Sequence, residues 1–169
     1  MNLFFLRHGK AEPRGSIWAS DGKRPLTSEG EKKMYEAVRG LQALELSFDI
    51  ILSSPFARAW RTAEILAEAY GAKKLVQTNN LLPEAGEIDL IEEVNARFAS
   101  FERVVLVGHE PFLSTLISIL LTGGAGVSID LKKGALCKLS VEKLVLGKCA
   151  VLEWLLTANQ MSRLGKGKD

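Results

Sequence analysis

Cysteine is scarce in this chain, and the cysteines that are present form no recognisable pair. Cys137 and Cys149 are the only two among 169 residues, and they are not in a C-x-x-C arrangement. Small secreted domains that depend on disulfides carry more cysteines than this. The composition therefore excludes a disulfide framework and indicates a protein of a reducing compartment.

An excess of one charge and long hydrophobic runs are lacking as well. The chain has 22 basic and 20 acidic side chains, a formal net charge of +2, and this balance does not favour nucleic acid or an anionic membrane as a partner. No apolar run approaches the ~20 residues of a membrane helix. The first residues contain neither a basic leader nor a small-residue cleavage site. We expect a soluble cytoplasmic protein with no nucleic-acid and no membrane partner.

Signatures of cofactor binding are also missing. The chain contains no P-loop, no G-x-G-x-x-G and no cluster with metal-ligand spacing. Its glycine-rich stretch at residues 123–126 follows a predicted helix, which is typical of a loop. We therefore expect neither a metal nor an organic cofactor.

Three short apolar runs without polar alternation indicate the fold class. They lie at residues 3–6, 50–52 and 104–107, and such runs are typical of parallel strands buried on both faces. Helical spacing follows between them: one helix begins behind Thr27 or Ser28, with Glu31 completing a capping box to Ser28, and another covers residues 57–70 before Gly71. Two more are predicted at about 88–98 and 111–121. Alternating strands and helices predict a single-domain α/β fold.

The last third of the chain has a different pattern. Residues 127–131, 135–141 and 149–156 resemble strands separated by glycine-containing turns, which predicts an antiparallel edge to the sheet. We place the domain at residues 1–160 and a flexible basic tail at residues 161–169, frayed from residue 165 onward.

Polar residues follow each of the three buried strands directly. In open α/β sheets ligands bind beyond the carboxyl ends of the strands, so these three exits are expected to meet in one crevice. His8 and His109 are the only histidines, and both lie at such exits. Either one alone could be a structural hydrogen-bonding group. The three exit sequences are Arg7-His8-Gly9, Ser53-Ser54-Pro55 with Arg58, and Gly108-His109-Glu110.

Two arginines beside two imidazoles are typical of a phosphate site. The guanidinium group presents a planar fork of donors that matches phosphate oxygens and keeps its charge in any surroundings. A neutral imidazole nitrogen is nucleophilic near neutral pH, and the phosphoramidate it forms is readily hydrolysed. On this reasoning either His8 or His109 could accept a phosphoryl group.

With these elements in place, the sequence resembles the histidine phosphatase superfamily, which includes phosphoglycerate mutases and acid phosphatases. The resemblance covers roughly residues 1–115 and implies a three-layer α/β/α domain with a mostly parallel central sheet. It also implies that His8 is the nucleophile, that Arg7 and Arg58 bind phosphate, and that His109 supports the transferring group. The motifs that carry it are Arg7-His8-Gly9, Pro25-Leu26-Thr27 with Gly30, Ser53-Ser54-Pro55 through Arg58 with Arg61-Thr62-Ala63, and Val107-Gly108-His109-Glu110.

Within this superfamily the short length is similar to the SixA-type phosphohistidine phosphatases, which implies a signalling role on a phosphorylated histidine phosphotransfer domain. Glu84 stands where the family places its acidic proton donor, although a solvated loop carboxylate is the other reading. Lys10 and Ala11 depart from the acidic or amide and hydroxyl residues common after R-H-G, which disfavours a phosphoglycerate-type substrate.

The leaving group favours the same assignment. Protonated phosphohistidine expels a neutral imidazole, whereas an alkyl phosphate expels an alkoxide unless an acid protonates it. Three alternatives remain: a broad-specificity phosphomonoesterase that acts on small phosphate esters, a non-catalytic phosphoprotein-binding module, and a mutase.

Overall fold

A six-stranded sheet lies at the centre of the computed structural model, which describes residues 1–15, 17–71 and 74–165. The strand order is β3-β2-β4-β1-β5-β6. The first four strands along the chain are parallel, and the last two are antiparallel, which confirms the predicted antiparallel edge. The strands are β1 (Asn2–Arg7), β2 (Ile50–Ser53), β3 (Leu75–Gln77), β4 (Arg103–Gly108), β5 (Leu136–Val141) and β6 (Ala150–Leu156).

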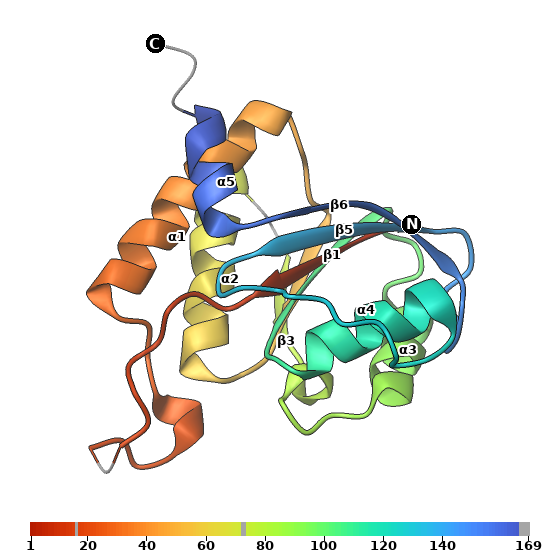
Figure 1. Ribbon diagram of the computed structural model, residues 1–169, viewed down its shortest axis with the longest axis horizontal. Coiled ribbons are helices and arrows are strands. Elements are labelled where there is room, and N and C mark those ends of the chain that lie inside the picture. Colours follow the sequence, from red (N-terminus) through yellow and green to blue (C-terminus); the bar gives the residue numbers. More distant parts are fainter. Residues whose placement is uncertain (16, 72–73, 166–169) are drawn as a thin grey trace.

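Helices cover both faces of this sheet, as Figure 1 shows. One face carries α1 (Ser28–Leu41), α2 (Ala57–Tyr70) and α5 (Ala158–Leu164), and the other carries α3 (Glu87–Arg97) and α4 (Phe112–Thr122). The described residues also contain three single-turn 3-10 helices: η1 (Asp21–Lys23), η2 (Gln42–Leu44) and η3 (Asn79–Leu81). This arrangement confirms the three-layer α/β/α fold. Within the described residues no helix is both long and apolar enough to cross a membrane.

The uninterrupted apolar run of β1 has a simple structural cause. Leu3 and Phe5 pack into the core beneath α3 and α4, while Phe4 and Leu6 pack into the core beneath α1 and α2. Successive side chains of a strand point to opposite faces, so a central strand covered on both sides must be apolar throughout. The apolar runs of β2 and β4 are explained in the same way, because their side chains are also divided between the two cores.

Of the helix ends predicted from the sequence, the end of α2 is confirmed and the capping box of α1 is not. As predicted, α2 stops at Gly71, whose φ of 58° lies in the left-handed region that glycine tolerates. The capping box predicted between Ser28 and Glu31 is wrong. Thr27 is the cap of α1, and its Oγ1 accepts from the main-chain N of Gly30 at 2.9 Å.

Residues 127–131 form a loop, so the strand predicted there is wrong. β5 already occupies the edge of β1, and β6 covers β5. The loop is fixed by side chains from other elements instead. The Oγ of Ser118 accepts from Val127 N at 3.0 Å, and Arg7 Nη1 donates to Leu131 O at 2.9 Å.

The start of the predicted tail also needs correction. Residues 161–164 lie in α5, which Thr157 caps through a capping box with Gln160. Met161 is buried against α1, where a side chain on Gly40 would collide with its main-chain oxygen. Residues 166–169, the rest of the predicted tail, lie outside the described residues.

Candidate active site

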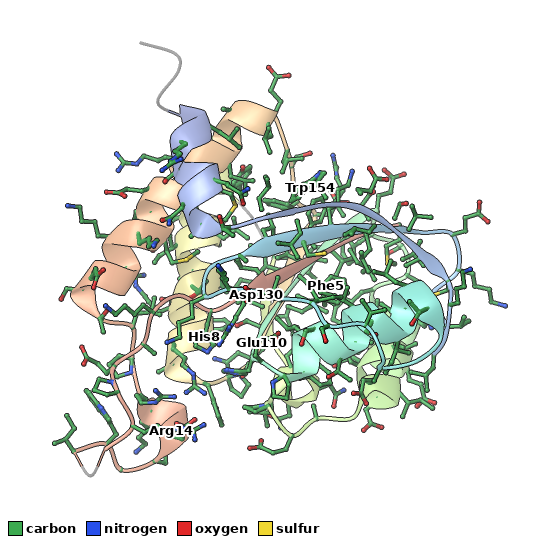
Figure 2. All side chains as sticks on the ribbon, in the orientation of Figure 1. Phe5, His8, Arg14, Glu110, Asp130 and Trp154 are labelled. Carbon is green, nitrogen blue, oxygen red and sulfur yellow. The ribbon has the colours of Figure 1, made fainter. Side chains whose placement is uncertain are left out.

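The carboxyl ends of the three central parallel strands meet at one edge of the sheet. β4 lies between β1 and β2, with Arg7 paired to Gly108 and Ser53 paired to Val107. The residues that follow these strands are therefore side by side. Figure 2 shows His8 and Glu110 at this same edge, next to the amino-terminal end of α4.

His8 is buried, and one of its ring nitrogens forms a hydrogen bond with the main chain. Its Nδ1 lies 2.8 Å from the carbonyl oxygen of Gly9, which only accepts, so Nδ1 carries the proton. Burial, together with Arg58, Arg7 and Lys133, lowers the pKa of His8 to about 3, although the Gly9 hydrogen bond opposes this. The ring is neutral at pH 7, and Nε2 is unprotonated, with its electron pair directed at Arg58 Nε 3.3 Å away.

His109 is the second buried imidazole of the site. Its ring centroid lies 5.1 Å from that of His8, and the edge of Phe56 packs against it. Burial and the neighbouring His8 and Arg58 lower the pKa of His109 to about 3. Among the described residues its Nδ1 has no hydrogen-bond partner, although the atom is buried.

The other nitrogen of His109 contacts Ser54. Its Nε2 lies 2.8 Å from Ser54 Oγ, which also accepts from the main-chain N of Phe56 at 3.3 Å. Ser54 has no other acceptor for its hydroxyl proton in the part of the chain that the structure describes. The hydroxyl therefore donates to Nε2, and His109 carries its proton on Nδ1.

Arg58 lies in the first turn of α2 and connects three groups. Its Nε donates to His8 Nε2 at 3.3 Å, Nη1 donates to the main-chain oxygen of Asp21 at 2.8 Å, and Nη2 donates to Asp21 Oδ2 at 2.9 Å. Burial opposes ionisation of Asp21, but the guanidinium groups of Arg58, Arg24 and Arg14 together hold the pKa of that carboxyl below its usual range. Sequence reasoning missed Asp21, because a 3-10 helix of three residues carries no periodicity and Asp21 lies in no motif.

Arg7 precedes His8 as the last residue of β1. Its Nη1 is bonded to Leu131 O, its Nε is buried without a hydrogen-bond partner among the described residues, and its charge contributes to the low pKa of His8. The structure thus brings His8, His109 and Arg58 into contact and places Arg7 beside them.

Glu84 does not contact either histidine. It is exposed, and in the described part of the chain its side chain makes no hydrogen bond or ion pair. It lines a cavity of about 420 Å³ together with Arg14, Trp18 and Asp21. Glu84 and Asp21, the residue that Arg58 contacts, therefore line the same cavity without a recorded contact between them.

Thr62 connects the segments that carry His8 and Arg58, a role that its motif does not reveal. Its Oγ1 accepts from the main-chain N of Gly9 at 3.1 Å and donates to the main-chain oxygen of Arg58 at 2.7 Å. One buried hydroxyl therefore fixes the segment that carries His8 against the helix that carries Arg58. Among the described residues no group of three His, Cys, Asp or Glu side chains is placed to hold a metal ion.

Comparisons with known proteins agree with this geometry. The model of the histidine phosphatase superfamily (branch 1) matches residues 3–98. A protein of Picosynechococcus sp. (strain ATCC 27264 / PCC 7002 / PR-6), named as uncharacterized, is 37% identical over 139 residues, covering 80% of this chain and 82% of that protein. Phosphohistidine phosphatase SixA of Escherichia coli (strain K12) is 27% identical over 128 residues, covering 73% and 76%.

A solved structure extends the likeness to the whole fold. The protein histidine phosphatase SixA complexed with tungstate superimposes with a TM-score of 0.80, covering 94% of this chain and 98% of that chain at 22% identity.

Proposed function

The chain belongs to the histidine phosphatase superfamily, and from this premise we propose that it is a cytoplasmic phosphatase that acts on phosphohistidine carried by another protein. His8 is the nucleophile and Arg7, Arg58 and His109 hold the phosphoryl group. The observation that carries this proposal is the state of His8: buried, neutral, protonated on Nδ1 and unprotonated on Nε2, the atom to which Arg58 Nε donates.

The first step transfers the phosphoryl group to His8. Nε2 forms a bond to phosphorus while the bond from phosphorus to the substrate's ring nitrogen breaks, and that nitrogen keeps the bonding electrons. Arg58 and Arg7 supply positive charge to the phosphoryl oxygens, which stabilises a loose transition state. The Nδ1 proton of His109 has no partner among the described residues and is available to one of these oxygens.

The second step returns His8 to its starting state. Because Nδ1 stays protonated against the Gly9 carbonyl, the phosphorylated ring is cationic and leaves as a neutral imidazole. A water oxygen bonds to phosphorus, the bond from phosphorus to Nε2 breaks, and the water proton leaves with the phosphate. No metal or organic cofactor is needed for either step.

The substrate assignment rests on the position of Glu84. An exposed carboxylate that does not contact the histidines is poorly placed to protonate an alkoxide, whereas a protonated phosphohistidine needs little help from an acid. The similarity to SixA of Escherichia coli supports the same substrate class. A histidine phosphotransfer domain is the kind of partner that would present such a group.

A broad-specificity phosphomonoesterase is the second candidate. It is favoured by one observation: Glu84 shares a cavity with Asp21, the residue that holds Arg58. A leaving group in that cavity would bring its oxygen toward Glu84. A binding module without turnover remains a third reading, which any turnover excludes.

A substrate panel separates these candidates. The purified chain is incubated with a phosphorylated histidine phosphotransfer domain, an aryl phosphate and an alkyl phosphate, and kcat/KM is compared, with His8→Asn as the control for contaminating phosphatases. We expect the phosphohistidine protein to be preferred by at least about 100-fold over the alkyl phosphate, the lower range of general acid catalysis. Preference for the alkyl phosphate would contradict the proposal and support the phosphomonoesterase.

The intermediate is tested separately. Brief reaction with a radiolabelled substrate should leave label on the chain that is labile in acid and stable in base, as expected for a phosphoramidate. The label should be absent from His8→Asn. Label on that variant would assign the nucleophile to His109 instead.

A further inference from the structure

A second cavity lies directly beside the nucleophile, on the side of Arg7. Its volume is about 350 Å³, and it is bounded by the segment after β1, the first turns of α1 and the loop before β5. Figure 2 shows Asp130, from that loop, near the end of β1 and His8. Five cationic side chains line the cavity: Arg7, Lys10, Lys33, Lys132 and Lys133.

The positive charge of this cavity, which we call the lysine cavity, exceeds its negative charge. Only Glu29 and Asp130 oppose the five cations, and each is already paired, Glu29 with Lys10 and Asp130 with Lys132. Among the described residues neither Lys33 nor Lys133 forms an ion pair. The cavity therefore has net positive charge with two lysines available to an anion.

The walls of the lysine cavity are tied to the nucleophile by main-chain contacts. The main-chain N of Gly134, next to Lys133, donates to the carbonyl oxygens of Arg7 and His8 at 3.0 and 3.1 Å. The opposite wall is tied through Thr27, whose main-chain N donates to the oxygen of Lys10 at 2.9 Å. Gly30 packs so closely on that oxygen that a side-chain carbon there would lie 2.1 Å from it. The position of the cavity relative to His8 is therefore fixed before a substrate binds.

These observations point to a specific occupant. We propose that the lysine cavity binds carboxylate side chains that flank the phosphohistidine on the protein substrate. The inference rests on the proposed function and names the feature by which the partner is recognised. Arg7 belongs to both the lysine cavity and the phosphoryl site, so the two sites are adjacent. Because the cavity is positively charged, a ligand that fills both sites needs a second anionic group next to its phosphoryl group.

An acidic protein segment meets this requirement through ordinary helix geometry. Side chains three or four residues from a helical phosphohistidine lie on the same face, about 5–6 Å away between Cβ atoms. Lysine is a flexible point charge that pairs with a carboxylate in several geometries, which suits a partner whose acidic residues differ in exact position. The lysine at position 10, which departs from the family pattern, belongs to this cavity.

The proposal is tested by binding, without turnover. Two fluorescent helical peptides carry a non-hydrolysable phosphohistidine analogue and differ only in having Glu or Gln at the positions three and four residues on either side. Fluorescence anisotropy gives the Kd of each for the full chain at low salt. We expect the Glu peptide to bind about tenfold more tightly, and its advantage to shrink at high salt because exposed charges are screened.

Matched charge variants assign this preference to the cavity. Lys33→Gln combined with Lys133→Gln should reduce the preference for the Glu peptide to less than about twofold. The control is Lys32→Gln, because Lys32 directly precedes Lys33 in α1 but does not line the cavity, and this variant should keep the preference. The ratio of the two Kd values cancels any effect that the lysines have on the phosphoryl site itself.

Three results would overturn the proposal: equal affinity of the wild type for both peptides, a preference that survives the double substitution, or an equal loss in Lys32→Gln. Failure of the proposed function looks different, because it is measured as turnover. A chain that prefers the Glu peptide but hydrolyses no phosphohistidine protein keeps the lysine cavity as an acidic-segment site and loses the assigned reaction.

Discussion

Both terminal nitrogens of Arg58 donate hydrogen bonds to Asp21, Nη1 to the main-chain oxygen at 2.8 Å and Nη2 to Oδ2 at 2.9 Å. Asp21 thereby holds the loop that contains η1 over the amino-terminal end of α2 and directs the Nε edge of Arg58 toward His8. The orientation of a proposed phosphate-binding residue thus depends on a carboxylate outside the sequence motif.

The first prediction follows from this pair. Asp21→Asn should lower kcat by about tenfold, because the amide holds the guanidinium less firmly and misplacement of a catalytic group is costly. The same change should tighten inhibition by inorganic phosphate, because a negative charge is removed beside the phosphoryl site. Steady-state kinetics with an aryl phosphate measures both values. Glu142 is exposed on the β5–β6 connection, and Glu142→Gln removes one negative charge just as Asp21→Asn does. This control should change neither kcat nor the inhibition by phosphate. Weaker phosphate inhibition in Asp21→Asn would contradict this account.

The second prediction concerns Arg58 itself. Arg58→Lys keeps the charge but cannot contact His8, the Asp21 carboxylate and the Asp21 main-chain oxygen from one nitrogen atom. We expect kcat/KM to fall by about 100-fold or more and inhibition by vanadate to weaken. The exposed Arg39→Lys is the control. Activity close to that of the wild type would make Arg58 a structural residue.

The third prediction tests how His109 holds its proton. Ser54 donates to Nε2 and so leaves the proton on Nδ1, which is free for a phosphoryl oxygen. Ser54→Ala should lower kcat by about tenfold and change the ring ¹⁵N shifts of His109 toward a mixture of tautomers. Ser53→Ala is a matched control, since Ser53 is equally buried and bonds only to a main-chain oxygen. Unchanged ¹⁵N shifts in Ser54→Ala would remove this role from Ser54.

Much of this site was predictable because parallel strands align their ends. The apolar runs of β1, β2 and β4 located the strand exits, and with them His8, Arg58 and His109. The exact partners were not predictable from the chain. The contacts of Asp21 and Ser54 depend on side-chain packing between segments far apart in the sequence, and no local pattern encodes this packing.

The incorrect elements have physical explanations of the same kind. Residues 127–131 have the apolar content of a strand, but the sheet edge that they would need is taken by β5. β3 has only three residues, too few for a periodic signal. α5 was missed because most of its seven residues are polar and only Ala158 and Met161 are buried, which is too few apolar positions to show helical spacing.

The fourth prediction is a dependence of stability on pH. The pKa values of His8 and His109 are about 3 in the folded chain, whereas an unfolded histidine titrates near 6.5. Between these values the unfolded chain binds more protons, so the stability from each histidine is complete above about pH 6.5 and declines as the pH falls toward 3. The slope is ~1.4 kcal/mol per pH unit for each group.

Urea unfolding at pH 7 and pH 5 measures this decline. The loss of unfolding free energy between the two values should be smaller by about 2 kcal/mol in His109→Asn than in the wild type. His8→Asn should behave in the same way and serves as an independent check. Carboxylates titrate mainly below pH 5, and their effect on the unfolding free energy is the same in the wild type and the variants, so it cancels in the comparison. An equal loss in all three proteins would show that the histidines are not held neutral.

The fifth prediction concerns Glu84 and the nature of the leaving group. Glu84 is exposed, contacts neither histidine and lines the cavity that contains Asp21. If the natural substrate leaves as an imidazole, Glu84→Gln should lower its turnover only about twofold to threefold. Because Glu84 is poorly placed to protonate an alkoxide, we expect an alkyl phosphate to lose equally little, whereas a working general acid would make it lose about 10²- to 10⁴-fold. With such an acid, an aryl phosphate, whose phenol has a pKa of about 10 or lower, would fall between them.

The comparison must be made on formation of the phosphorylated enzyme. Hydrolysis of that intermediate is common to all three substrates, so a slow second step would hide differences in the first. Rapid-quench measurements of the first turnover isolate the transfer to His8. Equal losses on all three substrates would remove the acid role and leave Glu84 as a residue that shapes the cavity. A large loss confined to phosphohistidine would instead contradict the leaving-group argument, because that substrate is the one that needs least protonation.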